Sequence, residues 1–181
     1  MDVLQGIMEE HYLVAQKVGS TLLPAVSEVV NLITQAFDRG GCLYVFGNGG
    51  SAADAQHFAA ELVGRFQRER EPLPAVALST DTSALTCIGN DYSFADVFAR
   101  QVKALVGRED VVVGITTSGN SENVVRGLKA ARDLGATTVA FTGASGGKAA
   151  ETVQRVLAVP STTTARVQEM HVLLIHMICA R

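Results

Sequence analysis

Short runs of apolar, mostly β-branched residues alternate with helical segments over most of this 181-residue chain, and this alternation is its strongest constraint on fold. The runs lack the apolar–polar alternation of strands with one solvent-exposed face, so we expect strands that are buried on both faces. Strands that alternate with helices predict a parallel sheet with right-handed crossovers. We predict five strands, at residues 42–46, 75–78, 111–115, 137–141 and 156–159.

The helical segments complete a three-layer α/β sandwich. Residues 2–39 show apolar residues at helical spacing, which predicts two N-terminal helices that are separated at Gly19–Ser20 and ended by Gly40–Gly41. No linker, repeat or low-complexity segment divides the chain, so we predict a single domain over residues 1–181. Further helices are expected at 51–63, at 82–105 with a break at Gly89–Asp91, at 121–134, at 147–153 and from about Thr164 onward.

The composition and net charge argue against several classes of binding partner. The 15 Lys and Arg against 18 Asp and Glu give a net charge of −3, so we expect no nucleic-acid partner and no anionic-membrane partner. No apolar run approaches the roughly 18 residues of a membrane span, and no basic signal region opens the chain. Three cysteines without a CxxC pair fit a reducing compartment, so we predict a cytoplasmic protein. The low charged fraction, 18%, and the apolar terminal helices indicate an oligomer.

Two loops that follow predicted strands are rich in glycine and hydroxyl residues. Gly47–Ser51 leads directly into a helix, and its glycines permit a close approach of the backbone to a ligand. Thr116–Ser121 holds the same position after the third strand and carries four hydroxyls, more than one helix cap requires. Such loops share the carboxyl edge of a parallel sheet, where ligands bind. Hydroxyls and amides without Lys or Arg suit a phosphate monoester, so we predict a phosphosugar site.

The first loop, taken alone, has a simpler interpretation as a tight turn in which Ser51 caps the helix. It is not a dinucleotide fingerprint, because positions 47, 49 and 52 read Gly, Gly, Ala and no acidic residue closes the second strand. It is not a P-loop either, since that motif requires Lys followed by Ser or Thr.

Polar residues on two predicted helices are candidates for chemistry. His57 and Glu61 are four apart, hence on one helix face and about 6 Å apart, which suits two ligands of one metal or a base and its neighbour. Such pairs are also common on exposed surfaces. Gln168 and His176 are eight apart on the last helix, so they can converge on one site only with extended side chains.

Two further histidines lack an evident role. His171 competes with His176, but its apolar neighbours on the last helix favour a core or interface histidine. His11 has no partner that the sequence identifies.

Six stretches of the sequence, in order over most of the chain, carry a resemblance to a known family: GNGGSAADAQHFAAELVGRF (47–66), LPAVAL (73–78), TDTSAL (80–85), IGNDYSFADVFARQV (88–102), GITTSGNSENV (114–124) and ARVQEMHVLLIH (165–176). In these stretches the chain resembles the sugar isomerase (SIS) domain family, and within it the phosphoheptose isomerases. The family usually has Ser at the position of Thr116, so a hydroxyl is retained there.

The resemblance implies a fold, an assembly and an activity. The fold is a SIS domain with a flavodoxin-like sheet over residues 1–181, and residues 1–40 form an N-terminal helical extension used in oligomer packing. The assembly is a homotetramer with its active sites at subunit interfaces. The activity is the conversion of sedoheptulose 7-phosphate to D-glycero-D-manno-heptose 7-phosphate through an enediol, the first step of nucleotide-activated heptose biosynthesis.

The resemblance also assigns roles to residues. Glu61 and His176 would be the acid–base pair, with Glu61 as the base. One Zn²⁺ per subunit would be held by His57, Glu61, Gln168 and His176. Substrate contacts would come from Asn48, Gly49, Gly50, Ser51, Glu61, Asn90, Asp91, Thr116, Thr117, Ser118, Ser121 and Gln168.

Two alternatives remain open at this point. One is a non-catalytic SIS-domain protein that binds a phosphosugar or a protein partner and serves regulation; such relatives lose the acid–base residues, whereas Glu61 and His176 are present here. The other is an isomerase of a shorter phosphosugar, against which the IGND element (88–91) and the His57/Glu61 pair favour the heptose.

Overall fold

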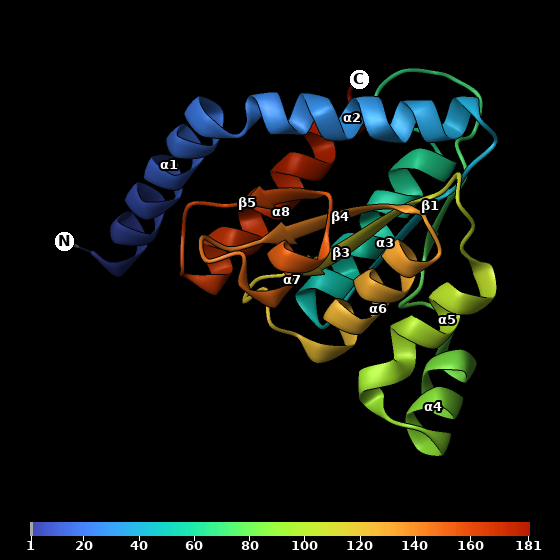
Figure 1. Cartoon of the computed structure of the whole chain (residues 1–181). Coiled ribbons are helices and arrows are strands. Elements are labelled where there is room, and N and C mark those ends of the chain that lie inside the picture. Colours follow the sequence, from blue (N-terminus) through green and yellow to red (C-terminus); the bar gives the residue numbers. More distant parts are fainter. Residues whose placement is uncertain (1) are drawn as a thin grey trace.

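The computed structural model describes residues 2–181 and contains one all-parallel sheet of five strands (Figure 1). The strand order β2-β1-β3-β4-β5 is that of flavodoxin-like doubly wound folds, so the predicted fold class is confirmed. The strands lie within two residues of the predicted positions: β1 (Leu43–Gly47), β2 (Ala75–Ala77), β3 (Val111–Thr116), β4 (Thr137–Thr142) and β5 (Arg155–Ala158).

Helices cover both faces of the sheet. The helices α2, α3 and α8 pack on one face with α1 beside α8, and α4 to α7 with a short 3₁₀ helix, η1, lie on the other side (Figure 1). Among residues 2–181, none of these helices is both long and apolar enough to span a membrane. Their bounds are α1 (Val3–Thr21), α2 (Leu23–Asp38), α3 (Gly50–Val63), α4 (Thr82–Asp91), η1 (Phe94–Asp96), α5 (Val97–Leu105), α6 (Glu122–Asp133), α7 (Gly147–Thr152) and α8 (Thr164–Cys179).

The strands are buried on both faces, as their unbroken apolar runs predict. Leu43 and Val45 of β1 point into the core beneath α2, α3 and α8, whereas Phe46 points into the core on the opposite face. There the Phe46 ring stacks on Phe98 of α5, with ring centroids 4.8 Å apart. The sheet is therefore packed between two apolar cores, and the loops at its carboxyl edge begin from buried strands.

The boundary between α1 and α2 differs from the prediction. The break lies at Leu22 rather than at Gly19–Ser20. Glycine in a helix costs only about 1 kcal/mol, whereas Pro24 lacks a backbone N–H and is tolerated only in the first turn of a helix, so it forces a new start.

The predicted end of α2 at Gly40–Gly41 is confirmed. Gly40 has a φ of +80°, and its N–H donates to the carbonyl oxygen of Phe37 at 2.9 Å. The Gly41 N–H donates to Ala36 at 2.8 Å, which completes a Schellman motif.

The break within the predicted helix 82–105 is also displaced. The helix α4 continues through Gly89–Asp91 and stops at Tyr92, after which η1 and α5 follow. Ser93 is fully extended, and its hydroxyl donates to the Asp96 carboxylate at 2.6 Å. This local hydrogen bond starts the next helical segment, so the interruption falls at a serine rather than at the glycine.

Candidate active site

The two loops singled out by sequence follow β1 and β3, which are neighbours in the sheet. From β1 the chain adds β2 on one side and then crosses over to add β3 on the other side, so the strand order reverses between β1 and β3. Ligands bind at this switch point in open α/β sheets. Gly47–Ser51 and Thr116–Ser121 therefore flank the position that the fold favours for a ligand.

The glycine loop turns into α3 without a side-chain cap. Gly49 is the N-cap, with a φ of +55° that favours glycine, and no side chain caps the helix there. Ser51 is buried, and its backbone N–H donates to the Asn48 carbonyl oxygen at 3.0 Å. The interpretation of Ser51 as a simple cap is therefore wrong, and Gly49 and Gly50 lie exposed at the helix start.

The hydroxyl loop is held by its own polar groups. Thr116 is buried, and its Oγ1 lies 3.0 Å from the hydroxyl of Ser121, while the Ser118 hydroxyl accepts from the Asn120 N–H at 3.1 Å. Ser121 is the N-cap of α6, yet its side chain makes no cap hydrogen bond. Hydroxyls and free N–H groups therefore meet at the start of α6, which suits a phosphate.

An amide pair joins the two loops. The Asn48 side chain and the Asn123 side chain at the start of α6 exchange two hydrogen bonds of 2.8 Å. Asn123 is buried, whereas Asn48 is half-buried.

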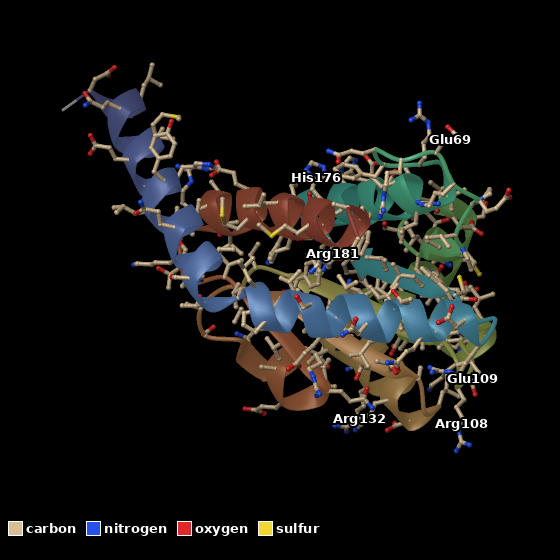
Figure 2. The ribbon with its side chains drawn as sticks, turned by 90° about the horizontal axis from the view of Figure 1, so that it is seen from above. Glu69, Arg108, Glu109, Arg132, His176 and Arg181 are labelled. Carbon is tan, nitrogen blue, oxygen red and sulfur yellow. The ribbon has the colours of Figure 1, made fainter. Side chains whose placement is uncertain are left out.

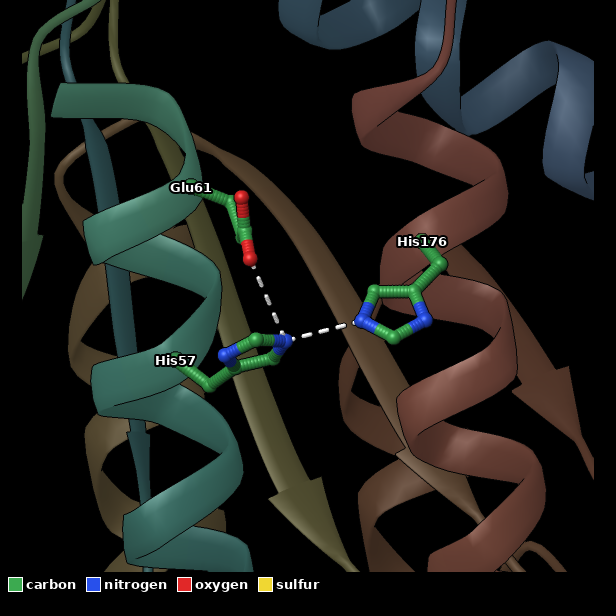
Figure 3. A group of neighbouring side chains, drawn as sticks. All are labelled: His57, Glu61 and His176. Carbon is green, nitrogen blue, oxygen red and sulfur yellow. Dashed lines mark hydrogen bonds and ion pairs between the residues drawn. The ribbon is translucent and has the colours of Figure 1, made fainter. Parts of the chain in front are cut away.

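Three side chains from two helices form a compact polar group. His57 and Glu61 on α3 point toward His176 on α8, as Figure 3 shows. The Nε2 atoms of His57 and His176 are 2.8 Å apart, and the Glu61 carboxylate lies 3.6 Å from His57 Nε2. Figure 2 shows His176 on α8, which packs against both α2 and α3.

The loop after α3 braces this group. The Phe66 ring stacks on His176 with centroids 5.2 Å apart and planes inclined by 22°. Arg70 donates to the backbone carbonyl oxygens of Glu61 and Leu62, both at 2.9 Å, and so satisfies the end of α3. A cavity of about 390 Å³ lies on this side of the molecule, but none of the three polar side chains lines it.

Asp54 and Cys179, which lie near this polar group, have raised pKa values. Burial raises the pKa of Asp54, one turn before His57, to about 6, and the charge of His57 opposes that rise. Its Oδ2 has no hydrogen-bond partner among the described residues. Burial raises the pKa of the Cys179 thiol to about 12, with a further contribution from the Glu61 carboxylate.

The polar group fits a divalent metal. One ligand atom from each of His57, Glu61 and His176 lies within 4.8 Å of the others. Two imidazoles and one carboxylate form a donor set that zinc accepts in catalytic sites. The structure therefore shows a possible His/Glu/His metal site.

Gln168 lies on α8, about two turns before His176. Its Nε2 is 2.5 Å from the point where a Cβ on Gly50 would stand, so its amide packs against the start of α3. It is eight positions before His176 on α8, about 12 Å along the helix axis. The structure places Gln168 beside the glycine loop.

Asn90 and Asp91 lie at the far end of α4, which projects outward on the side of the sheet opposite α8 (Figure 1). The Asn90 amide donates to Asp91 at 2.8 Å, and Asp91 lies 3.5 Å from the Cys87 sulfur. The hydrogen bonds of these side chains thus stay within α4.

The two other histidines have structural partners. His171 is fully buried and contacts the Thr142 carbonyl oxygen at 3.2 Å, as expected of a core histidine, and burial lowers its pKa to about 4. His11 lies 2.8 Å from the Glu169 carboxylate, which joins α1 to α8.

Sequence reasoning missed Asp54, Phe66, Arg70 and Asn123. Asp54 precedes His57 by three residues and so shares its helix face, a signal that was available. Phe66 and Arg70 belong to a loop whose contacts no periodicity predicts. Asn123 reads as an ordinary residue of a helix start.

Comparisons with known proteins point to one family. Residues 9–143 match the model of the SIS domain. The phosphoheptose isomerase of Aquifex aeolicus is 60% identical over 154 residues, which are 85% of this chain and 81% of that protein. The phosphoheptose isomerase of Geotalea daltonii is 49% identical over 179 residues, 99% of this chain and 93% of that protein.

A solved structure agrees over nearly the whole fold. The phosphoheptose isomerase of Neisseria gonorrhoeae is 46% identical and superposes with a TM-score of 0.93, covering 98% of this chain and 95% of that one. This chain belongs to the SIS domain family and, within it, to the phosphoheptose isomerases.

Proposed function

We propose that this chain interconverts sedoheptulose 7-phosphate and D-glycero-D-manno-heptose 7-phosphate, the step that opens nucleotide-activated heptose biosynthesis. The name of its relatives, phosphoheptose isomerase, supports the reaction class and the substrate. The observation that carries the proposal is the close approach of Glu61 and His176 around His57, because aldose–ketose isomerisation requires an acid–base pair.

The substrate would lie along α3. Gly50 and Glu61 are eleven positions apart on this helix, about 16 Å along its axis, so the two ends of an extended phosphosugar would have separate binding groups. The phosphate would bind the start of α6, and the glycine loop would contact the sugar. The proposed substrate contacts are Asn48, Gly49, Gly50, Ser51, Glu61, Asn90, Asp91, Thr116, Thr117, Ser118, Ser121 and Gln168.

Glu61 and His176 would move the protons. The Glu61 carboxylate takes a proton from C1 of the ketose, and His176 donates one to the carbonyl oxygen on C2, which gives the enediol. Return of a proton from Glu61 to C2, with loss of the O1 proton to His176, leaves the aldose. Both residues end in their starting states, so the isomerisation balances.

The metal would be zinc, one per subunit. His57, Glu61, Gln168 and His176 would hold it, and the two residues of α8, which are eight apart, would reach it with extended side chains. A bound zinc ion would polarise the carbonyl and stabilise negative charge on the enediolate oxygens. His57 has no other role in the proposed proton transfer.

We further propose a homotetramer in which residues 1–40 pack against other subunits. The exposed apolar residues of α1 support this, because Leu4, Tyr12 and Leu13 are 58–70% accessible in the single chain. The position of Asn90 and Asp91 on the projecting α4 supports a site shared between subunits. The cysteines Cys42, Cys87 and Cys179 are unpaired, which agrees with a cytoplasmic location.

A coupled assay with sedoheptulose 7-phosphate, run with and without a metal chelator, tests the proposed function. We expect turnover that the chelator removes and that added Zn²⁺ restores. Absence of turnover by the metal-loaded protein would contradict the proposed substrate.

A further inference from the structure

The amide pair between Asn48 and Asn123 has a fixed polarity. Two facing amides can exchange hydrogen bonds equally well if both are turned over together, so the pair alone does not determine which atom points where. The backbone N–H of Val124, however, donates to Asn123 Oδ1 at 3.0 Å. The Asn123 oxygen must therefore face this N–H, and the Asn48 nitrogen must face the Asn123 oxygen.

This polarity decides what Asn48 can offer a ligand. One hydrogen of Asn48 Nδ2 goes to Asn123, and Asn48 Oδ1 accepts from Asn123 Nδ2, both at 2.8 Å. The second Nδ2 hydrogen makes no hydrogen bond to any residue in the range 2–181. Asn48 is half-buried, so it presents an N–H donor, which suits an oxygen of a phosphosugar.

Asn123 is buried and holds the Asn48 amide in this orientation. Its accessibility is 3%, and its own amide groups are used by Asn48 and Val124. The pair also links the glycine loop, which follows β1, to the start of α6, which directly follows the hydroxyl loop.

We infer that Asn123 is a positioning residue for substrate binding: it orients the Asn48 amide as a donor and holds the two loops in register. The inference rests on the proposed function, in which Asn48 contacts the phosphosugar. Asn123 then contributes to binding only through Asn48 and does not touch the substrate itself.

A double-mutant cycle tests this dependence. The proteins are the unmodified chain, Asn48→Ala, Asn123→Ala and the double variant, each loaded with metal, with kcat and KM measured for sedoheptulose 7-phosphate. Lys129→Ala, at an exposed position of α6, the helix that carries Asn123, is the control. The affinity of each protein for sedoheptulose 7-phosphate is also measured by calorimetry, and thermal unfolding checks the fold.

We expect Asn123→Ala to raise KM about tenfold, the scale of a lost hydrogen bond or two, while kcat changes by less than about threefold. In the Asn48→Ala background the same substitution should raise KM by less than about twofold, because the residue through which it acts is gone. The Lys129→Ala control should match the unmodified chain.

Two results would overturn the inference: a KM within twofold of the unmodified value for Asn123→Ala, or equal effects of that substitution in both backgrounds. If Asn123→Ala does not fold, Asn123→Ser repeats the comparison, since a serine hydroxyl can still accept from a nearby backbone N–H. Absence of turnover by the unmodified chain would count against the proposed function, and the calorimetric affinities then decide on Asn123 separately.

Discussion

His57 and His176 face each other with their Nε2 atoms 2.8 Å apart, although 119 residues separate them in the chain. Two imidazole lone pairs repel at this distance, so the contact is favourable only if one nitrogen carries a proton or both face a cation. The rings meet nearly edge to face, with an interplanar angle of 73°. The packing of α3 on α8 therefore brings these two imidazoles together, and Glu61 joins them as a second residue of α3.

Metal removal should abolish activity and lower stability. A metal bound only to the folded protein stabilises it by mass action, so chelation should lower the thermal unfolding midpoint as well as the rate. His57→Ala should reduce zinc content, measured by elemental analysis, and leave the fold intact. Full activity of a metal-free preparation would contradict this part of the account.

The hydroxyl loop should control KM. Ser118→Ala and Ser121→Ala should each lose on the order of 1 to 3 kcal/mol of a charge-assisted contact to phosphate, which raises KM about tenfold or more with little change in kcat. Thr152→Ala, at the distant end of α7, is a comparison for loss of a threonine hydroxyl. Steady-state kinetics that show unchanged KM in both serine variants would place the phosphate elsewhere.

Buried His171 should make stability depend on pH. The pKa of His171 is about 4 in the folded chain against a usual value of 6.5. Between pH 4 and pH 6.5 this histidine is therefore protonated in the unfolded chain and neutral in the folded chain. Stability is therefore fully present above about pH 6.5 and falls as pH drops toward 4, by about 3 kcal/mol from this residue.

Urea unfolding of the unmodified chain and of His171→Leu at pH 7 and pH 4 measures this term. The variant should show a smaller loss between the two pH values. The Thr142 carbonyl oxygen keeps its hydrogen bond from the Val159 N–H in the variant, so no backbone group is left unpaired. Equal losses in both proteins would show that other groups govern the acid response.

The helix α1 should carry the subunit contacts. Light scattering of the unmodified chain should give a tetramer, and Leu13→Glu should weaken it, because a charge in an apolar interface is costly to desolvate. Ala104→Glu adds the same charge at an exposed position of α5, outside residues 1–40, and should leave the tetramer intact. A monomer at micromolar concentration in the unmodified chain would contradict the proposed assembly.

The sheet was predictable because it depends on local pattern. Runs such as Val111–Ile115 contain no polar side chain, and every residue of this run is buried, as in a strand between two helical layers. Helix boundaries were less predictable, since glycine marks flexibility without requiring a break. Pro24 and Ser93 determined the breaks through a missing N–H and a side-chain hydrogen bond.

The candidate site was predictable only in part. Spacing places His57 and Glu61 on one helix face, but nothing local indicates that α8 brings His176 to them. The resemblance supplied that grouping. The positions of Gln168 beside Gly50 and of Asn90 on an outer helix depend on tertiary packing, which motif matching does not describe.

Solvent-deuterium exchange into C1 of sedoheptulose 7-phosphate tests the central claim, that Glu61 is the base and His176 its acid partner. Glu61→Gln and His176→Gln should each lower kcat by about 10²–10⁴-fold or more with the fold and tetramer intact. Because both residues are also proposed metal ligands, zinc content is measured alongside, and His57→Ala shows what loss of a ligand alone does.

The account predicts that Glu61→Gln, with metal retained, no longer exchanges deuterium into C1. Exchange and turnover by Glu61→Gln at the rates of the unmodified chain would show that this carboxylate only holds the metal or the fold, and would contradict the proposed mechanism.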